Sequence, residues 1–484
     1  MQAHLLRHYF SSGASLEPEN RIKTLQAVQK AVQIHLPRLY DALQEDLHKS
    51  KQESYLTEIA FVLSEIDYHI KHVKKWSKPQ HKRSSVILFP SKSRILYQPY
   101  GVVLIIAPWN YPFRLLFAPM IAAIAAGNCV LLKPSHLALH TADICVEIIK
   151  TAMQIIHKQP AYIPISENQV PATWGTKQNL PASPIEIMTG GPKVMENLLQ
   201  EKYDYIFYTG GPGFGKTIAG KAAEDLTPVT LELGGKSPCI ITATSNLKLA
   251  AKRVAWGKFL NCGQTCVAPD YLLIESTVKN DFLCFLKSAI HTLYDSPINK
   301  SPFYGRIIAL PAFNRLKAMI GANPNTILYG GATNEQTLFI EPTILDAGTL
   351  SNIEKINTVP AMQEEIFGPI LPVIEYTNLK DAVHFINSRP KPLALYLFAD
   401  KPTANQILKN TFSGGACVND TIMHIATNNL PFGGVGLSGM GNYHGKYGFE
   451  TFSHKKSYVV SLRNFDLPLK YPPYKWFERI KRFL

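Results

Sequence analysis

The feature that most limits the fold of this chain is a regular alternation of short β-rich runs with helical runs in its first half. Five β-rich runs lie at residues 102–107, 130–133, 185–188, 205–208 and 229–233. Strands that alternate with helices build a mostly parallel sheet with helices on both faces. Such doubly wound sheets bind ligands outside the carboxyl ends of their strands. We therefore predict an α/β fold with a ligand site along that edge.

The segment before these runs is expected to be helical and to cover one face of the sheet. Apolar residues recur there at helical spacing, at Ile22, Leu25, Val28 and Val32 and again at Leu56, Ile59, Leu63 and Ile66. Residues 86–97 have strand composition around a turn at 90–93. They are predicted to form a hairpin inserted into this domain.

Composition limits the class of protein. A chain of 484 residues with 46% hydrophobic and 18% charged residues can fill two or three packed cores. Its seven cysteines are an odd number without disulfide-framework spacing, which predicts free thiols and a cytoplasmic location. The longest apolar stretch, residues 117–132, is shorter than a membrane span and interrupted by Gly127 and Asn128. No transmembrane helix and no signal peptide is predicted.

The formal charge of +14 is unusual. It is compatible with nucleic acid, an anionic membrane or a polyphosphate ligand. The basic residues are spread rather than gathered into a nucleic-acid module, so no nucleic-acid partner is predicted. Residues 475–484, however, place apolar side chains on one helical face and cations on the other. That tail suits an anionic membrane surface, and it also suits docking on the protein itself or on a partner subunit.

The glycine-rich segment 210–217 fits the G-x-x-x-x-G-K-[ST] pattern of a P-loop and follows a β-rich run. A nucleotide hydrolase is therefore one candidate, although no apolar strand ending in a magnesium-binding Asp is evident downstream. The same glycines would also let a helix N-terminus approach a pyrophosphate, whose charge its amides and dipole favour.

Three side chains together suggest a chemistry. Asn110, Glu232 and Cys266 are an amide donor, a carboxylate and a thiol. These groups are sufficient to capture a carbonyl covalently, stabilise its oxyanion and hydrolyse the product. Cys262 is a competing nucleophile or a disulfide partner for Cys266. A CxxxC pair with no second Cys/His cluster does not indicate zinc, so no metal site is predicted.

The segments around these residues, 108–112, 231–236 and 262–266, resemble the aldehyde dehydrogenase superfamily, and residues 431–446 resemble its class 3 branch. The resemblance extends from about residue 55 to about residue 468. It implies a Rossmann-type cofactor domain, an α/β catalytic domain and a β bridging element for oligomerisation, typically in a homodimer. The cofactor domain is expected at residues 1–81 and 100–234, and the catalytic domain at 235–445. The bridging element is expected at 82–99 and 446–468, followed by a basic tail at 469–484.

The resemblance implies oxidation of aldehydes to carboxylic acids with NAD or NADP. Cys266 attacks the aldehyde, the Asn110 amide and the Cys266 N–H hold the oxyanion, and Glu232 activates the water that hydrolyses the thioester. Relatives that transfer the acyl group to coenzyme A generally lack this carboxylate. Tyr111, Phe113, Leu115 and Leu116 would suit an apolar tunnel, so medium-to-long aliphatic or aromatic aldehydes are expected.

The resemblance also assigns cofactor residues. Gly210 and Gly215 are expected at the pyrophosphate and Lys133 at the adenosine ribose. Glu365 is expected to hold the nicotinamide ribose, with Phe367 packed beside the nicotinamide. His136 stands where the family commonly carries Glu, which removes a charge that would repel the 2′-phosphate of NADP.

Two alternatives to an aldehyde dehydrogenase remain at this point. One is a P-loop nucleotide hydrolase that uses residues 210–217, and the other is a catalytically silent dinucleotide-binding protein. Residues 157–184, with five prolines, are an insertion relative to class 3 relatives and are predicted to form a surface loop.

Overall fold

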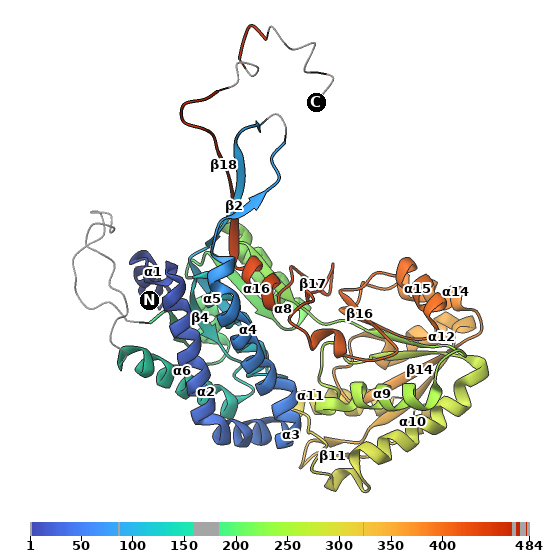
Figure 1. Ribbon diagram of the computed structural model, residues 1–484. Helices are drawn as coiled ribbons and strands as arrows, with labels where there is room; N and C mark the ends of the chain where they lie inside the picture. Colours follow the sequence, from blue (N-terminus) through green and yellow to red (C-terminus); the bar gives the residue numbers. More distant parts are fainter. Residues whose placement is uncertain are drawn as a thin grey trace.

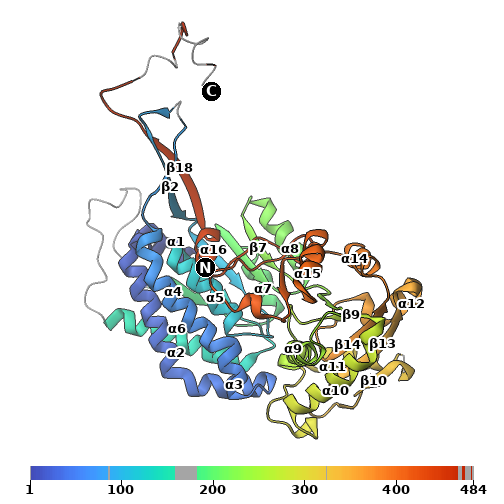
Figure 2. The same ribbon diagram turned by 45° about the vertical axis from the view of Figure 1, so that its right-hand side comes forward.

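Two large sheets with their helices form two lobes, and a small third sheet projects away from both (Figure 1). The computed structural model describes residues 2–85, 88–158, 183–322, 324–466, 471–474 and 481. The predicted α/β fold is confirmed. A view turned by 45° shows the same separation into two lobes (Figure 2).

The first lobe contains a six-stranded sheet of order β17-β7-β6-β3-β4-β5. Its strands are β3 (Val102–Ile106), β4 (Cys129–Lys133), β5 (Ile185–Ile187), β6 (Tyr205–Thr209), β7 (Val229–Glu232) and β17 (Gly439–Met440). All neighbours are parallel except β17, which runs antiparallel to β7 at the edge. The five β-rich runs predicted from the sequence are its five parallel strands. Every residue of β3 and β4 is buried, because helices cover both faces.

Helices precede and separate these strands, as predicted. They are α1 (Gln2–Ser11), α2 (Pro18–Leu47), α3 (Lys51–Ser54), α4 (Ala60–Trp76), α5 (Arg114–Ala126), α6 (Leu139–Lys158), α7 (Pro192–Leu198) and α8 (Pro212–Glu224). Helix α2 packs against α6, and α4 packs against α5. One expected core position is wrong, because Leu56 is 72% exposed while Ile59, Val62 and Ile66 are buried. A π-helical turn at Tyr55–Ile59 changes the helical phase there and turns Leu56 away from the core.

The second lobe contains a seven-stranded sheet of order β10-β13-β14-β9-β8-β15-β16, parallel except at β10. Its strands are β8 (Pro238–Ile241), β9 (Tyr271–Glu275), β10 (Ile327–Tyr329), β13 (Thr343–Thr349), β14 (Ile370–Tyr376), β15 (Ala394–Phe398) and β16 (Gly415–Val418). Its helices are α9 (Leu247–Phe259), α10 (Lys279–Tyr294), α11 (Leu310–Gly321), α12 (Ile353–Thr358), α13 (Pro360–Gln363), α14 (Leu379–Asn387) and α15 (Lys401–Asn410). A two-stranded ladder, β11 (Thr333–Asn334) with β12 (Phe339–Ile340), lies beside them.

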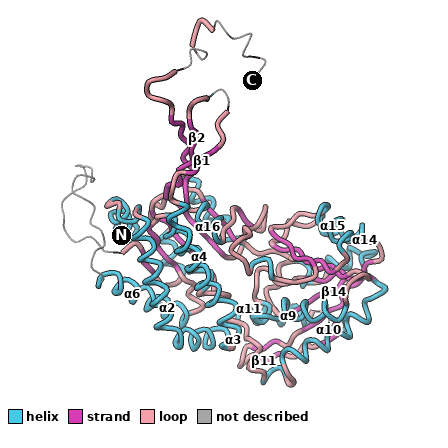
Figure 3. The backbone as a smooth tube through the Cα atoms, in the orientation of Figure 1, coloured by secondary structure: helices cyan, strands magenta, loops and turns pink. Residues whose placement is uncertain are grey.

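The third sheet consists of β1 (Gln80–Lys82), β2 (Lys92–Pro99) and β18 (Ser453–Val460), all antiparallel (Figure 3). Helix α16 (Gly445–Thr451) leads into β18, which pairs with the whole of β2. The predicted pairing of a hairpin with a late strand is therefore confirmed. The predicted position of the first hairpin strand is wrong, because β1 lies before residue 86. Its polar sequence concealed it, since a strand exposed at a sheet edge needs no apolar face.

All seven cysteines are free, as the sequence predicted. Within the described ranges, no helix combines the length and the apolar character needed to cross a bilayer. Most of the Pro-rich segment 157–184 and most of the tail 469–484 lie outside the described residues.

Candidate active site

Three adjoining cavities follow the carboxyl edge of the six-stranded sheet into the space between the lobes. The groove cavity, about 640 Å³, is lined by residues that include Lys133, His136 and Gly210. The central cavity, about 230 Å³, shares Trp109 and Thr209 with the groove cavity. The apolar cavity, about 410 Å³, shares Leu115 and Cys266 with the central cavity. The three cavities therefore lie next to one another, with the central cavity between the other two.

The central cavity brings together the three side chains that the sequence singled out for chemistry. Asn110, from the loop after β3, and Glu232, at the end of β7, line it together with Cys266. Glu365 and Phe367 complete its wall. A thiol, an amide and a carboxylate from distant parts of the chain thus face one small space, whereas the sequence contains no local motif that joins them.

A left-handed turn precedes Cys266. After α9, Asn261 and Cys262 have φ angles of 51° and 54°, a conformation that costs about 1–3 kcal/mol for a residue other than glycine. Hydrogen bonds hold the turn, because the Asn261 side-chain amide donates to the carbonyl of Asn110 at 2.8 Å and to that of Gln264 at 3.2 Å. The turn fixes Cys266 in the wall between the central and apolar cavities.

The structure separates the two candidate thiols. Cys266 is half-buried and lines two cavities. Cys262 is fully buried, lines none of these cavities, and donates through Sγ to the hydroxyl of Tyr304 at 3.4 Å. Burial raises the pKa of both thiols to about 12, and Glu365 and Glu232 add to the rise at Cys266. The charge of Arg114 acts in the opposite direction on Cys266.

Asn110 is held from both ends. Its side-chain Nδ2 donates to the carbonyl of Gln264 at 3.0 Å, which uses one of its two N–H groups. Its own carbonyl accepts from Nζ of Lys49 at 3.0 Å. Lys49 is in turn paired with Glu58 at 2.5 Å, and both side chains are fully buried. The sequence analysis missed this ion pair, because a charged residue in a helical segment gives no sign that it is buried.

Glu232 is a buried carboxyl without a protein partner. Neither carboxyl oxygen accepts a hydrogen bond from any described residue. Burial raises its pKa well above the ordinary range, because a desolvated carboxylate is unfavourable. When ionised, a carboxylate in this environment is a stronger base than usual and can accept a proton from a water molecule that enters the cavity.

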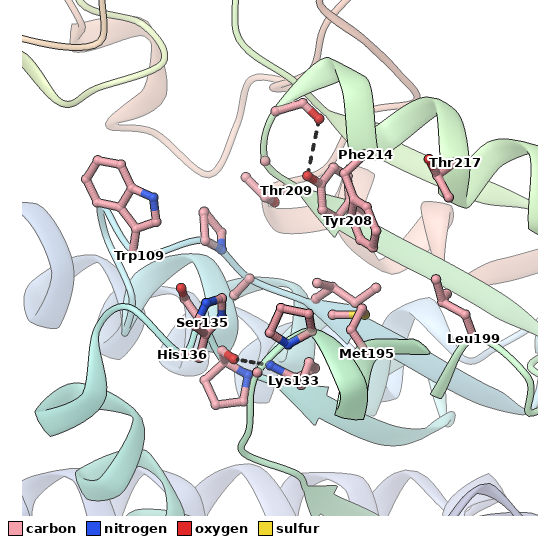
Figure 4. Close-up of a pocket in the computed structure, with 18 of the residues that line it drawn as sticks. Trp109, Lys133, Ser135, His136, Met195, Leu199, Tyr208, Thr209, Phe214 and Thr217 are labelled. Atoms are coloured by element: carbon pink, nitrogen blue, oxygen red, sulfur yellow. Dashed lines mark hydrogen bonds between the residues drawn. The ribbon is translucent and has the colours of Figure 1, made fainter. Parts of the chain in front are cut away.

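The groove cavity has features that fit a dinucleotide (Figure 4). Helix α8 starts directly beneath it at Pro212, so its first amides and its dipole can meet a phosphate. The Thr209 hydroxyl is buried there without a hydrogen-bond partner among the described residues, so it is available to a ligand. Lys133 is buried with Nζ donating to the carbonyl of Pro134 at 2.8 Å, and His136 lies nearby.

The glycines at the start of α8 have different surroundings. Gly210 lines both the groove and the central cavities. Gly215 is not part of either wall. A Cβ on Gly215 would lie 2.8 Å from Cδ2 of Leu233, so this glycine allows α8 to pack closely on the end of the sheet. Lys216 is exposed and does not line the groove, so the P-loop interpretation gains no support.

Glu365 and Phe367 approach the central cavity from the second lobe. Gly234 makes room for Glu365, since a Cβ on that glycine would overlap the Glu365 carboxylate. Burial, with help from Asp270, raises the pKa of Glu365 to about 8. The Phe367 ring meets Trp109 edge-on, with centroids 5.4 Å apart.

The apolar cavity is only partly the tunnel that the sequence predicted. Tyr111 and Leu115 line it, but Phe113 and Leu116 are fully buried in the core instead. Most of its wall comes from segments that the sequence analysis did not connect with the site, namely Phe61, Trp256, Ile422, Ile425 and Phe432. Arg114 is a buried cation in the same wall.

Comparison with known proteins identifies the family of this chain. Residues 7–458 match the family model described as aldehyde dehydrogenase family. The 4,4'-diaponeurosporen-aldehyde dehydrogenase of Staphylococcus aureus (strain NCTC 8325 / PS 47) is 41% identical over 477 residues, 98% of this chain and 96% of that protein. The dimeric NADP-preferring aldehyde dehydrogenase of Canis lupus familiaris is 40% identical, covering 96% of both chains. A solved structure described as the substrate-bound state of Staphylococcus aureus AldH has a TM-score of 0.89 at 40% identity, covering 99% of this chain and 98% of its own.

The chain belongs to the aldehyde dehydrogenase family. Its relatives include members of aldehyde dehydrogenase family 3, such as family 3 member A2 of Rattus norvegicus at 39% identity over 98% of this chain and 91% of that protein. It is an NAD(P)-dependent aldehyde dehydrogenase of the class 3 type, and it oxidises aldehydes to carboxylic acids.

Proposed function

We propose that this enzyme oxidises medium-to-long aliphatic and aromatic aldehydes. The observation that carries the proposal is the apolar cavity of about 410 Å³ that ends at Cys266. Each methylene that it buries contributes about 0.8 kcal/mol to binding. We therefore expect kcat/KM for octanal and benzaldehyde to exceed that for acetaldehyde by at least about tenfold in an assay of reduced nicotinamide. Equal efficiency, or a preference for acetaldehyde, would contradict the proposal.

We infer the following roles for the three central side chains. The Cys266 thiolate attacks the carbonyl carbon, a C–S bond forms, and the Asn110 Nδ2–H and the Cys266 N–H bind the resulting oxyanion. Bound NAD or NADP supplies the acceptor for the hydride that leaves this carbon. Glu232 then takes a proton from the water that attacks the thioester, and breakage of the C–S bond restores Cys266.

The cofactor residues follow the groove. We infer that Gly210 and the first turn of α8 meet the pyrophosphate, and that Lys133 reaches the adenosine ribose. Glu365 would hold the nicotinamide ribose, with Phe367 beside the nicotinamide. Gly215 would support cofactor binding indirectly, because it allows α8 to pack closely on the end of the sheet. The unpartnered Thr209 hydroxyl and the carboxyl-edge location support this placement.

His136 makes cofactor choice testable. It lines the groove and carries no negative charge to repel a 2′-phosphate. NADP should therefore be used with an efficiency comparable to that of NAD, measured as kcat/KM in the same assay. His136→Glu should lower NADP efficiency more than NAD efficiency, by about tenfold, because a carboxylate would then face the phosphate. A strong native preference for NAD that His136→Glu leaves unchanged would contradict this role.

We also infer that the enzyme is a cytoplasmic homodimer and that its domains follow the three sheets. The cofactor domain would comprise residues 1–81 and 100–234, the catalytic domain 235–445, and the bridging element 82–99 and 446–468. Three observations support it: free thiols, a projecting three-stranded sheet with exposed Val459 and Val460, and a dimeric relative. The basic tail 469–484 would give peripheral contact with anionic membrane, from its sequence pattern alone.

Truncation after Pro473 tests the tail. We expect the full-length enzyme to co-sediment with phosphatidylserine vesicles at low salt and to be released at high salt, because a short basic segment binds weakly and electrostatically. The truncated enzyme should keep its melting temperature, its dimer mass by light scattering and its activity, but lose sedimentation. A lower melting temperature or a monomeric mass of the truncated enzyme would show that the tail has a structural role. No vesicle binding by the full-length protein would likewise contradict the membrane contact.

A further inference from the structure

Arg114 is a buried cation inside the apolar cavity. It is the first residue of α5, is 9% exposed and shares the cavity wall with Cys266. Its hydrogen bonds are weak: Nη1 lies 3.5 Å from the carbonyl of Thr57 and Nη2 lies 3.3 Å from that of Ile425. Its Nε is buried and has no acceptor among the described residues. The guanidinium carbon lies 3.7 Å from the centre of the Phe61 ring.

The Arg114 guanidinium forms no ion pair with any carboxylate in the described part of the chain. The nearby acid, Glu58, is already occupied. Its Oε1 accepts from Lys49, and its Oε2 accepts the backbone N–H groups of Phe113 and Arg114. The cation therefore has only carbonyl dipoles and one aromatic face as partners. A buried charge so poorly compensated is unfavourable.

Apart from Cys266, which is a thiolate only when it acts as the nucleophile, the described residues that line the cavity include no acidic side chain. Tyr111 and Tyr443 have pKa values raised far above the ordinary range by burial, and the Tyr111 hydroxyl is bonded to that of Thr265 at 2.6 Å. His424 is neutral, since burial and the charge of Arg114 lower its pKa to about 4. Arg114 is thus the one Lys or Arg among the described residues that line this mostly apolar cavity.

We propose that Arg114 binds a carboxylate on the aldehyde substrate, so that the preferred substrates are aldehyde acids with an apolar body between the two groups. Guanidinium forms paired, charge-assisted hydrogen bonds with a carboxylate, and these are stronger where water is excluded. A single cation matches the single charge of a carboxylate, and the apolar wall suits the intervening chain or ring. The inference rests on the proposed role of Cys266 and of the apolar cavity, and the product would be a dicarboxylate.

Matched substrate pairs test the proposal on the native enzyme. Azelaic semialdehyde is compared with nonanal, and terephthalaldehydic acid with its neutral amide. We expect kcat/KM for at least one acid to exceed that of its neutral partner by at least about tenfold. If the neutral partner is preferred in both pairs, and azelate inhibits no better than nonanoate, the proposal is wrong.

Substitution of Arg114 tests whether this residue causes the preference for the acid substrate. In Arg114→Gln the acid-to-neutral ratio of kcat/KM should fall by at least about tenfold, to about one, while Arg114→Lys, which keeps the charge but loses the planar guanidinium, should retain part of the preference. If both members of a pair fall equally in Arg114→Gln, and the pKa for alkylation of Cys266 rises, Arg114 acts on the thiol and the proposal is overturned.

A binding measurement separates this inference from the proposed function. Azelate should bind the native enzyme with its dinucleotide at least about tenfold more tightly than nonanoate, by calorimetry, because only azelate has a second carboxylate. The enzyme could oxidise no aldehyde of the proposed class and still bind azelate more tightly than nonanoate. If Arg114→Gln then abolished that difference in affinity, the proposed function would be wrong and the Arg114 site would stand. Equal affinities would overturn the Arg114 site. If Arg114→Gln does not fold, the native substrate pairs and the two acids decide.

Discussion

Cys266→Ala should abolish aldehyde oxidation, with kcat lowered by at least about four orders of magnitude, while NAD still binds. The proposed covalent intermediate forms on this sulfur, and alanine has no nucleophile to replace it. The thiol lines the central and apolar cavities but not the groove, so dinucleotide affinity should change little. Stopped-flow absorbance of reduced nicotinamide measures the first effect, and titration of intrinsic fluorescence with NAD measures the second.

Cys262→Ala is the matched control, since it removes the same atoms four positions away. Cys262 is buried against Tyr304 and lines none of the three cavities. Its replacement should lower the melting temperature modestly, through loss of packing and one weak hydrogen bond, and leave most of kcat. An inactive Cys262 variant beside an active Cys266 variant would reverse the assignment of the nucleophile.

Glu232→Gln should slow hydrolysis of the thioester, with steady-state kcat lowered by about two to four orders of magnitude. The amide has nearly the shape of the carboxyl but cannot accept the proton of water. Since neither oxygen of Glu232 has a protein partner, the change breaks no hydrogen bond among the described residues. Rapid mixing should therefore show a burst of reduced nicotinamide followed by a slow phase. A uniformly slow trace without a burst, in a variant that still binds NAD, would argue against this role.

Much of the fold could be predicted because its information is local. Strands buried on both faces, such as β3 and β4, are continuous apolar runs, and the sequence displays them directly. Strand β1 was misplaced because an exposed edge strand carries no such run. Leu56 was misjudged because a π-helical turn changes the helical phase, and periodicity alone does not reveal such a turn.

The candidate site was predictable only where a motif marks it. Resemblance to a family selected Asn110, Glu232 and Cys266, and the structure brings these three side chains into one cavity. The residues that hold these three side chains in place were not predicted, because their roles depend on contacts between distant segments. Lys49 reaches the carbonyl of Asn110, and Asn261 holds the turn before Cys266. Gly215, expected at the cofactor from its motif position, stays a prediction, and its observed contact is close packing against Leu233.

If the aldehyde becomes a thioester on Cys266 and Glu232 directs its hydrolysis, the acyl-enzyme should accumulate in Glu232→Gln. Intact-mass spectrometry of this variant, quenched in acid after mixing with octanal and NAD, detects that species. We expect one added octanoyl group per chain, mapped by digestion to the peptide that contains Cys266 and absent when Cys266→Ala is combined with Glu232→Gln. An unmodified protein during active turnover, or an acyl group on Cys262, would contradict this mechanism.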